Sequence, residues 1–251
     1  MALHTLIRLA LVVVALAAWE AGSRLAEAVY FPPPSVIAAK TVTLWVSPEG
    51  AADVLPSLAR LGAGWAVAAA AGVALGLAIG RSRTLADLTG PLVHFGRSVP
   101  PAALLPLFLL FFPIGSPVQI AAIVYGVLWP VLINTADGAR FVDRQYLETA
   151  RVFRMGRAQQ LWRIILPAAA PKIFAGLRLS VSLALIMMVI SELYASTEGI
   201  GHRMREAEGI DIPALWAAIV LLGLLGIVLN SGFLLVEARL LAWHRGAHAE
   251  R

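Results

Sequence analysis

The sequence predicts an all-α integral membrane protein that crosses a bilayer six times and folds as a single domain over residues 1–251. Composition is the first reason. Hydrophobic residues make up 59% of the chain and charged residues only 14%, whereas about 25% of a soluble domain is charged. The second reason is the mean hydropathy of +0.80. No globular core can hide this much apolar surface, so lipid must surround much of the chain.

Apolar segments recur along the chain and give the six expected spans. The first of them is the weakest, because its uninterrupted apolar core, residues 9–19, is short of the ~20 residues that a membrane helix needs. A cleaved signal peptide is the alternative there, since residues 26–28 resemble a small-residue cleavage site. The expected spans are residues 6–26, 61–80, 101–112, 117–134, 173–195 and 214–236.

The region before the second span predicts a polar external segment over residues 30–56, since it opens with three consecutive prolines that disfavour helix. The second span itself contains Gly72, Gly76 and Gly80. Small residues at this spacing let helices approach closely. The alternative is a helix that simply faces lipid.

The third and fourth spans are separated by a tight turn and are rich in proline. Proline within a span frees backbone groups that neighbours or a water-lined cavity must satisfy. This suits a translocation path, although kinked helices are also common where nothing is transported. The prolines are Pro100, Pro101, Pro106, Pro113, Pro117 and Pro130.

The fifth span contains two ionisable residues, Arg178 and Glu192. A charge inside a membrane is costly and predicts a functional or pairing role. The alternative is snorkelling, in which the side chain reaches a nearby interface.

The segment between the fourth and fifth spans is basic and compatible with helix. Tyr146, Ala150 and Phe153 recur at one helix face. Gly156 is expected to break the helix by adopting an unusual φ, and the dipeptide Leu166-Pro167 is expected to end a second helical stretch that begins at residue 158. The result is an apolar knob within a ring of arginines, offered to a soluble partner or rested on anionic lipid.

The distribution of Lys and Arg predicts orientation. Fourteen of the twenty would lie on the side of this basic segment and five on the other, which puts both termini in the cytoplasm. The fourteen are Arg8, Arg81, Arg83, Arg97, Arg140, Arg144, Arg151, Arg154, Arg157, Arg163, Lys172, Arg239, Arg245 and Arg251; the five are Arg24, Lys40, Arg60, Arg203 and Arg205.

The sequence contains no recognisable catalytic constellation. There is no cysteine, which excludes thiol and iron–sulfur chemistry. No phosphate-binding G-x-x-x-x-G-K-[ST] motif occurs, so this chain does not bind nucleotide in that manner. The five histidines have no metal-ligand spacing; they are His4, His94, His202, His244 and His248. We therefore expect no catalytic residue, no metal, no cofactor and no nucleic acid, the net charge of +5 being an orientation signal.

The basic segment resembles the EAA motif of permease subunits in binding-protein-dependent ABC importers. The matching residues are Glu148, Ala150, Ile164, Leu166 and Pro167. Thr149 departs from the motif, and Arg154 stands where the family usually has glycine, which puts the bend geometry in question.

The rest of the chain is similar to the nitrate, sulfonate and taurine group of these permeases. The similarity extends from about residue 31 to residue 243. It is carried by residues 31–36, 97–108, 129–135, 176–179, 191–201 and 223–230.

The resemblance implies a type I ABC importer permease fold in a bacterial or archaeal plasma membrane. It implies a homodimer around a central pathway, two ATP-binding subunits that carry ATP and Mg, a soluble or lipid-anchored substrate-binding protein, and contact with membrane lipid. Residues 140–172 would form a cytoplasmic coupling loop. The solute would be a nitrate-, sulfonate- or taurine-like oxyanion, or a vitamin precursor.

Within the coupling loop, the resemblance implies roles for individual residues. Glu148 and Arg151 would make charged contacts to the ATPase, beside the apolar Phe153. Ala150 would give a close helix contact, while Gly156 and the Leu166-Pro167 pair shape the bend and its end. If the solute is an anion, Arg178 is expected to face the pathway.

Two other classes of function remain as alternatives. An autonomous secondary transporter or channel would need paired repeats or acidic residues at the membrane midplane. A membrane enzyme would need clusters of His, Asp or Glu near an interface. The sequence shows neither pattern.

Overall fold

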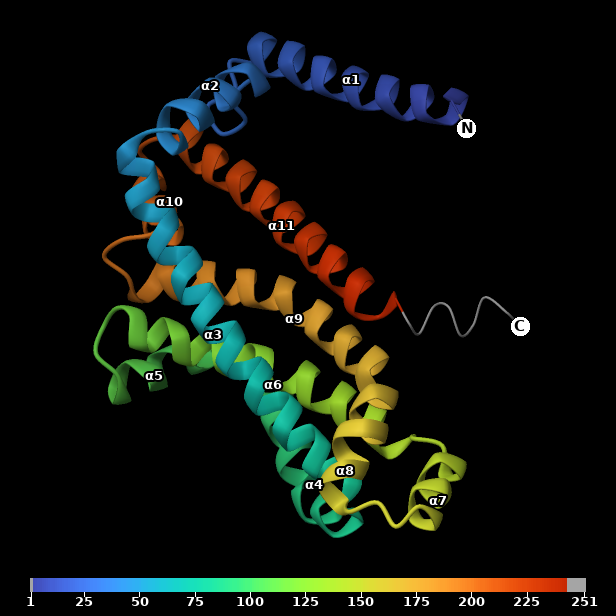
Figure 1. Cartoon of the computed structure of the whole chain (residues 1–251). Coiled ribbons are helices and arrows are strands. Elements are labelled where there is room, and N and C mark those ends of the chain that lie inside the picture. Colours follow the sequence, from blue (N-terminus) through green and yellow to red (C-terminus); the bar gives the residue numbers. More distant parts are fainter. Residues whose placement is uncertain (1, 243–251) are drawn as a thin grey trace.

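The computed structural model describes residues 2–242 (Figure 1), and over this range it consists of helices and their connections. Trp243, His244, Arg245, His248 and Arg251 lie outside the described residues. The elements are α1 (Ala2–Leu25), α2 (Pro34–Trp45), α3 (Pro48–Arg81), α4 (Arg83–Ser98), the 3₁₀ turn η1 (Pro101–Leu104), α5 (Leu105–Phe111), α6 (Ser116–Arg140), α7 (Arg144–Val152), α8 (Arg157–Gln160), the π-helical turn η2 (Leu161–Ile165), α9 (Leu166–Ala195), α10 (Ile200–Ala207) and α11 (Ile212–Leu240).

Five helices in this range are long and apolar enough to cross a membrane, and a bent pair would make a sixth, which agrees with the predicted all-α class. The five are Leu6–Leu25, α3, α6, the continuous stretch Arg157–Ala195 and α11. The sixth is α4 together with η1 and α5, which meet at 88°. The prediction of a span confined to residues 101–112 therefore missed the first arm of this candidate span, α4, and found only η1 and α5. Pro100 and Pro101 cannot donate backbone hydrogen bonds, so the helix breaks between the two arms.

The core of the fold is the packing of α3 against α6 and of α6 against α9. Glycines make the close approach of α3 and α6 possible. A Cβ atom on Gly72 would lie 2.9 Å from Val131, and one on Gly76 would lie 2.6 Å from the Cβ of Thr135. The predicted glycine-mediated helix contact is confirmed, and it is reinforced by buried Val127 and Met188 in the same apolar core.

Prolines begin helices in this fold more often than they end them. The prediction of a non-helical segment over residues 30–56 is wrong, because Pro34 and Pro48 are the first residues of α2 and α3. Proline fits the first helical position, where its missing N–H would have no partner anyway. Pro56 lies inside α3.

Pro167 also does not end a helix, although the sequence predicted that it would. The chain continues from α8 through η2 into α9, with Pro167 in the first turn of α9. In the π-helical turn that precedes it, hydrogen bonds run to the fifth residue. This wider turn accommodates a residue that lacks an N–H and crowds the carbonyl before it.

Helix α1 projects away from the other helices and meets them only near its C-terminal end (Figure 1). There, the Trp19 ring lies 5.3 Å from the Trp216 ring, and the carboxylate of Glu20 accepts hydrogen bonds from the backbone N–H and hydroxyl of Ser35. The apolar side chains of its first half are exposed in the single chain, Leu11 and Val13 among them.

Candidate functional site

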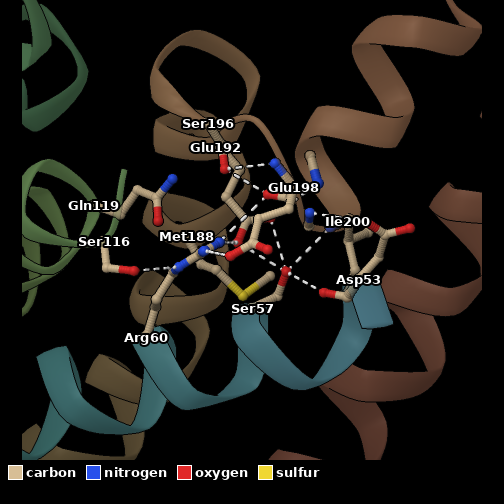
Figure 2. Close-up of polar contacts among 12 residues, drawn as sticks. Asp53, Ser57, Arg60, Ser116, Gln119, Met188, Glu192, Ser196, Glu198 and Ile200 are labelled. Atoms are coloured by element: carbon tan, nitrogen blue, oxygen red, sulfur yellow. Dashed lines mark hydrogen bonds and ion pairs between the residues drawn. The ribbon is translucent and has the colours of Figure 1, made fainter. Parts of the chain in front are cut away.

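Two regions at opposite ends of the bundle hold the polar residues that the sequence singled out, except Arg178. One lies where α10 packs on α3 and α9, and it is built around Glu192 (Figure 2). The other is formed by α7, α8 and η2, within residues 140–172 (Figure 1).

The first region begins with three polar residues on one face of α3. Asp53, Ser57 and Arg60 are spaced by four and three residues, so their side chains project on the same side. Arg60 is only 5% exposed and Ser57 is fully buried. They lie against α9 and α10, and we call the cluster of Asp53, Ser57, Arg60, Ser116, Glu192, Glu198 and Arg203 the Glu192 network (Figure 2).

Glu192 is 0% exposed, and its carboxylate accepts hydrogen bonds from three residues, two on α3 and one on α10. The Ser57 hydroxyl lies 2.8 Å from Oε1, the Arg60 guanidinium lies 3.2 Å from the same oxygen, and the backbone N–H of Gly201 donates to Oε2 at 3.0 Å. A buried carboxylate is tolerated only when it is paired and hydrogen-bonded in this way. The snorkelling alternative for Glu192 is therefore wrong.

Arg60 connects this carboxylate to its surroundings. Its Nε donates to the Ser116 hydroxyl at 2.9 Å, its Nη1 donates to the backbone oxygen of Glu198 at 3.3 Å, and its Nη2 pairs with the Glu198 carboxylate (Figure 2). One guanidinium therefore joins α3, the start of α6 and the connection between α9 and α10.

That connection is shaped by glycine and by further contacts to α3. Gly199 has φ +112°, a conformation that other residues rarely adopt, and a Cβ there would lie 2.7 Å from the Glu192 carboxylate. Its N–H donates to Oδ1 of Asp53 at 3.0 Å, and Arg203 on α10 donates to Oδ2 at 2.5 Å. The network thus clamps α10 onto α3.

Sequence reasoning found Glu192 in this network and missed its partners. Arg60 was counted as an external charge, Asp53 was assigned to the polar segment 30–56, and Ser57 was given no role. Their spacing was the available signal, because it aligns Asp53, Ser57 and Arg60 on one face of any helix that begins before Pro56.

Arg178 is not part of this network. Its side chain is exposed on α9, and among residues 2–242 no hydrogen bond or ion pair involves its guanidinium. The structure therefore brings Glu192 together with Arg60 and leaves Arg178 apart from both.

In the second region, two backbone hydrogen bonds form the C-terminal end of α7. The N–H of Met155 donates to the oxygen of Ala150 and the N–H of Arg154 donates to the oxygen of Arg151, both at 2.9 Å. This pair of bonds is the Schellman motif, whose first residue after the cap takes a left-handed conformation. Arg154 has that conformation, with φ +50°.

The expectation for Gly156 is therefore wrong. Its φ of −65° and ψ of 160° are open to any residue, and it precedes α8 as the N-terminal cap position. The unusual backbone angle lies two residues earlier, at Arg154, where the resemblance placed the family's glycine. The chain therefore still bends at residue 154, where an arginine adopts the left-handed conformation that glycine adopts most readily.

The surface of this region is apolar and basic. Tyr146 and Phe153 are exposed, Phe153 by 74%, and the side chains of Glu148, Arg151 and Arg154 are exposed around them. Ala150 is only 1% exposed. Its close contact is therefore within this chain, and it does not form part of the exposed knob as the sequence suggested.

The second region is joined to the bundle by a small apolar cluster. Val142 and Ile165 are buried there together with Ala139 at the end of α6. Arg81, the last residue of α3, donates to the backbone oxygen of Ala139 at 3.2 Å. The second region is therefore packed against the ends of α3 and α6.

Neither region carries a constellation for metal binding. Among the described residues, no group of three or more His, Asp or Glu side chains is placed to hold a metal ion.

Comparison with known proteins gives a clear match. Residues 70–242 match the family model of the binding-protein-dependent transport system inner membrane component. The match covers α4 to α11 and includes both the second region and Glu192.

Curated relatives extend the similarity. The chain is 30% identical over 228 residues to the taurine transport system permease protein TauC of Escherichia coli, covering 88% of this chain and 82% of TauC. It is 33% identical over 180 residues to the bicarbonate transport system permease protein CmpB of Synechococcus elongatus, covering 71% and 65% of the two chains. It is 32% identical over 187 residues to the nitrate import permease protein NrtB of a Synechocystis species, covering 74% and 68%.

Proposed function

This chain belongs to the family of inner membrane components of binding-protein-dependent transport systems, and from that premise we propose which solute it moves and how it is coupled. Members of this family are multi-pass permease subunits of ABC importers, and they are not enzymes. An ATPase and a substrate-binding protein are therefore the partners of this chain.

The proposed solute is a small oxyanion. The relatives' names give taurine, bicarbonate and nitrate, and these share a compact group with two or more oxygens that carry negative charge. A vitamin precursor, the other class implied by the resemblance, is the competing outcome.

The proposed assembly has two copies of this chain around one pathway, with two ATP-binding subunits at the α7 end. ATP and Mg bind to those subunits. In this arrangement the α7 end and both termini are cytoplasmic, the α10 end faces the soluble or lipid-anchored binding protein, and the exposed apolar faces of the spans contact lipid.

The observation that carries the coupling proposal is the exposed surface of α7. Phe153 and Tyr146 are large apolar side chains open to solvent beyond the membrane spans, and Glu148 and Arg151 lie on the same short helix. An aromatic centre within a charged rim is typical of a protein interface. We infer that this surface seats in a groove of the ATPase and moves when ATP binds.

Copurification tests this proposal. The chain is expressed with a candidate ATP-binding subunit of its transport system, solubilised in detergent and purified with either wild-type residues or Glu148→Arg. We expect the ATPase to copurify with the wild type and to be reduced at least tenfold by the variant, since charge reversal at an interface costs several kcal/mol. Glu49→Arg, on an exposed residue at the other end of the molecule, is the matched control.

The outcomes separate the functions. No ATPase with the wild-type chain would overturn the coupling proposal and favour an autonomous transporter or channel. An ATPase that is retained by Glu148→Arg would show that coupling runs through another surface. Uptake of radiolabelled taurine, nitrate and bicarbonate by the assembled transporter in vesicles then tests the solute class.

A further inference from the structure

Helix α4 is amphipathic along its whole length, although it forms one arm of a candidate span. Its exposed apolar side chains recur at i, i+3, i+7 and i+10, and they are Leu85, Leu88, Leu92 and Phe95. Its exposed polar side chains recur at i, i+4, i+11 and i+14, and they are Arg83, Asp87, His94 and Arg97. The two sets occupy different faces of the helix.

Contacts with α6 fix the depth that this polar face reaches. The hydroxyl of Tyr125 donates to the backbone oxygen of Gly96 at 2.7 Å, and a Cβ on Gly96 would lie 2.3 Å from the Trp129 ring. Tyr125 and Trp129 are the tenth and fourteenth of the 25 residues of α6. Gly96 and its neighbour Arg97 therefore lie beside the middle of a membrane span, although the sequence had counted Arg97 among the cytoplasmic charges.

An exposed guanidinium at this depth needs water or a charged partner. Its only polar contact among the described residues is with Nδ1 of His94, at 3.2 Å from Nη2, and no carboxylate pairs with it there. The middle of a bilayer is about 15 Å from either interface, which is beyond the reach of one side chain. Arg97 cannot face lipid without a large free-energy cost, so it faces an aqueous cavity.

The backbone bends directly after Arg97, at the same depth in the membrane. The chain turns by 88° at Val99 and Pro100, and η1 then packs against α6, where Pro101 lies near Gly126. Irregular backbone at membrane depth is tolerated only where it is buried in protein or lines a water-filled cavity. A broken span and an exposed charge at one depth are two independent signs of the same cavity.

We propose that the bend between α4 and η1 lines the solute pathway and that Arg97 binds the oxyanion group of the solute at the membrane midplane. This inference rests on the proposed function. A planar guanidinium can donate two parallel hydrogen bonds to two oxygens of one sulfonate, nitrate or bicarbonate group. The positive charge also offsets the negative end of the α4 dipole, which would otherwise repel an anion.

Arg178 is the other arginine at this depth. Gly176, two residues before it, would place a Cβ 3.0 Å from the backbone oxygen of Pro130, also in the middle of α6. Arg178 precedes no break in a helix, so it lacks the second of the two signs that mark Arg97. It is therefore the matched arginine against which Arg97 is tested.

The absence of cysteine from the chain allows a direct test by thiol labelling. Ser98→Cys places a single thiol next to Arg97, on an exposed residue. The assembled transporter in inside-out and right-side-out membrane vesicles is treated with two membrane-impermeant methanethiosulfonates, one carrying a sulfonate and one carrying a trimethylammonium group. Labelling of this chain is followed by its mass, with and without ATP and vanadate.

We expect Ser98→Cys to react with both reagents in at least one of these states, and Phe95→Cys, on the apolar face, to remain unlabelled. Adding Arg97→Gln should lower the ratio of the anionic to the cationic labelling rate by roughly fivefold or more, as expected for removing one charge a few ångströms away in water. Adding Arg178→Gln should change this ratio less.

Two results would overturn the inference. One is a thiol at residue 98 that stays unlabelled in every state, which would place the bend against lipid or protein. The other is an anionic-to-cationic ratio that Arg97→Gln leaves unchanged. Copurification first establishes whether the ATPase assembles with this chain, and neither labelling readout requires the solute to be known, so failure of this inference and failure of the proposed function are distinguishable.

Discussion

The two ends of this molecule treat their charged residues in opposite ways. At the α10 end, Glu192, Arg60 and Asp53 are buried and fully engaged with one another and with backbone N–H groups. At the α7 end, Glu148 and the arginines around it are exposed, and no ion pair among residues 2–242 involves residues 140–172.

The difference teaches which end is complete in the single chain. A network of buried side chains that are all hydrogen-bonded to one another fixes a conformation without help from a partner. A surface of exposed aromatic and charged groups gains stabilisation only when another protein covers it. The α10 end is thus a fixed point of the bundle, while the α7 end carries the surface that we propose binds the ATPase.

The strongest way to break this comparison is to remove the centre of the satisfied network. Glu192→Ala leaves the Arg60 guanidinium buried with Glu198 as its remaining carboxylate, and we expect a loss of about 3–5 kcal/mol. The apparent Tm of the detergent-solubilised protein measures it. The control is Glu198→Gln, because that carboxylate is 54% exposed and should matter much less. An equal loss in both variants would mean that Glu192 is not the centre.

The helix packing that holds the two ends together can be tested next. Gly76→Ala introduces a methyl group 2.7 Å from the backbone oxygen of Leu132, and we expect a loss of about 2 kcal/mol from overpacking. Gly62→Ala, on the same helix, meets nothing within 4 Å and should be neutral or slightly stabilising. Thermal unfolding of the two variants in one detergent decides the point, and matching Tm values would contradict close packing.

The unsatisfied end should respond differently, with little effect on stability and a large effect on binding. Phe153→Ala removes an exposed aromatic side chain, and we expect ATPase affinity to fall by about 2 kcal/mol, or roughly thirtyfold. Titration of the purified permease with ATPase measures this affinity. Val152→Ala, exposed on the neighbouring residue, serves as the comparison. A lowered Tm of the free Phe153→Ala permease would instead indicate a structural role.

The smallest expected effect concerns the left-handed backbone conformation of Arg154 at the end of α7. Arg154→Gly relieves a left-handed backbone conformation that costs a non-glycine residue about 1 kcal/mol, so the local helix end should become more stable by about that amount. Hydrogen exchange at the amides of Arg154 and Met155 reports it. Gly156→Ala, where φ is ordinary, should not destabilise the bend. Slower exchange in Arg154→Gly would confirm the strain, and faster exchange would contradict it.

Sequence reasoning predicted the features that depend on local patterns and missed those that depend on contacts between distant residues. The all-α class and the glycine contacts of α3 follow from hydropathy and spacing, and the structure confirms them. The α10 end was not predicted beyond Glu192, because Arg60 and Glu192 are 132 residues apart and no spacing rule joins them. The π-helical turn before Pro167 was also missed, because a proline in a sequence predicts the end of a helix unless the wider turn before it is known.

The bend of α7 shows the same limit on a smaller scale. A glycine at residue 156 invited the assignment of the unusual backbone angle to that position. The Schellman hydrogen bonds instead fix the angle at Arg154, because they are counted from the end of α7. The location of a helix end, which is the least certain part of any sequence pattern, therefore decided which residue bends.

The isolation of α1 has a consequence for how the protein is made. Its ring contact at Trp19 is with Trp216, which follows 197 residues later in the chain. At synthesis rates of about 5–20 residues per second, that partner leaves the ribosome roughly 10–40 seconds after Trp19. During this interval the end of α1 is held by residues close to it in sequence, among them Phe31 and Ser35. The first helix to be synthesised is thus among the last to reach its contacts in the bundle.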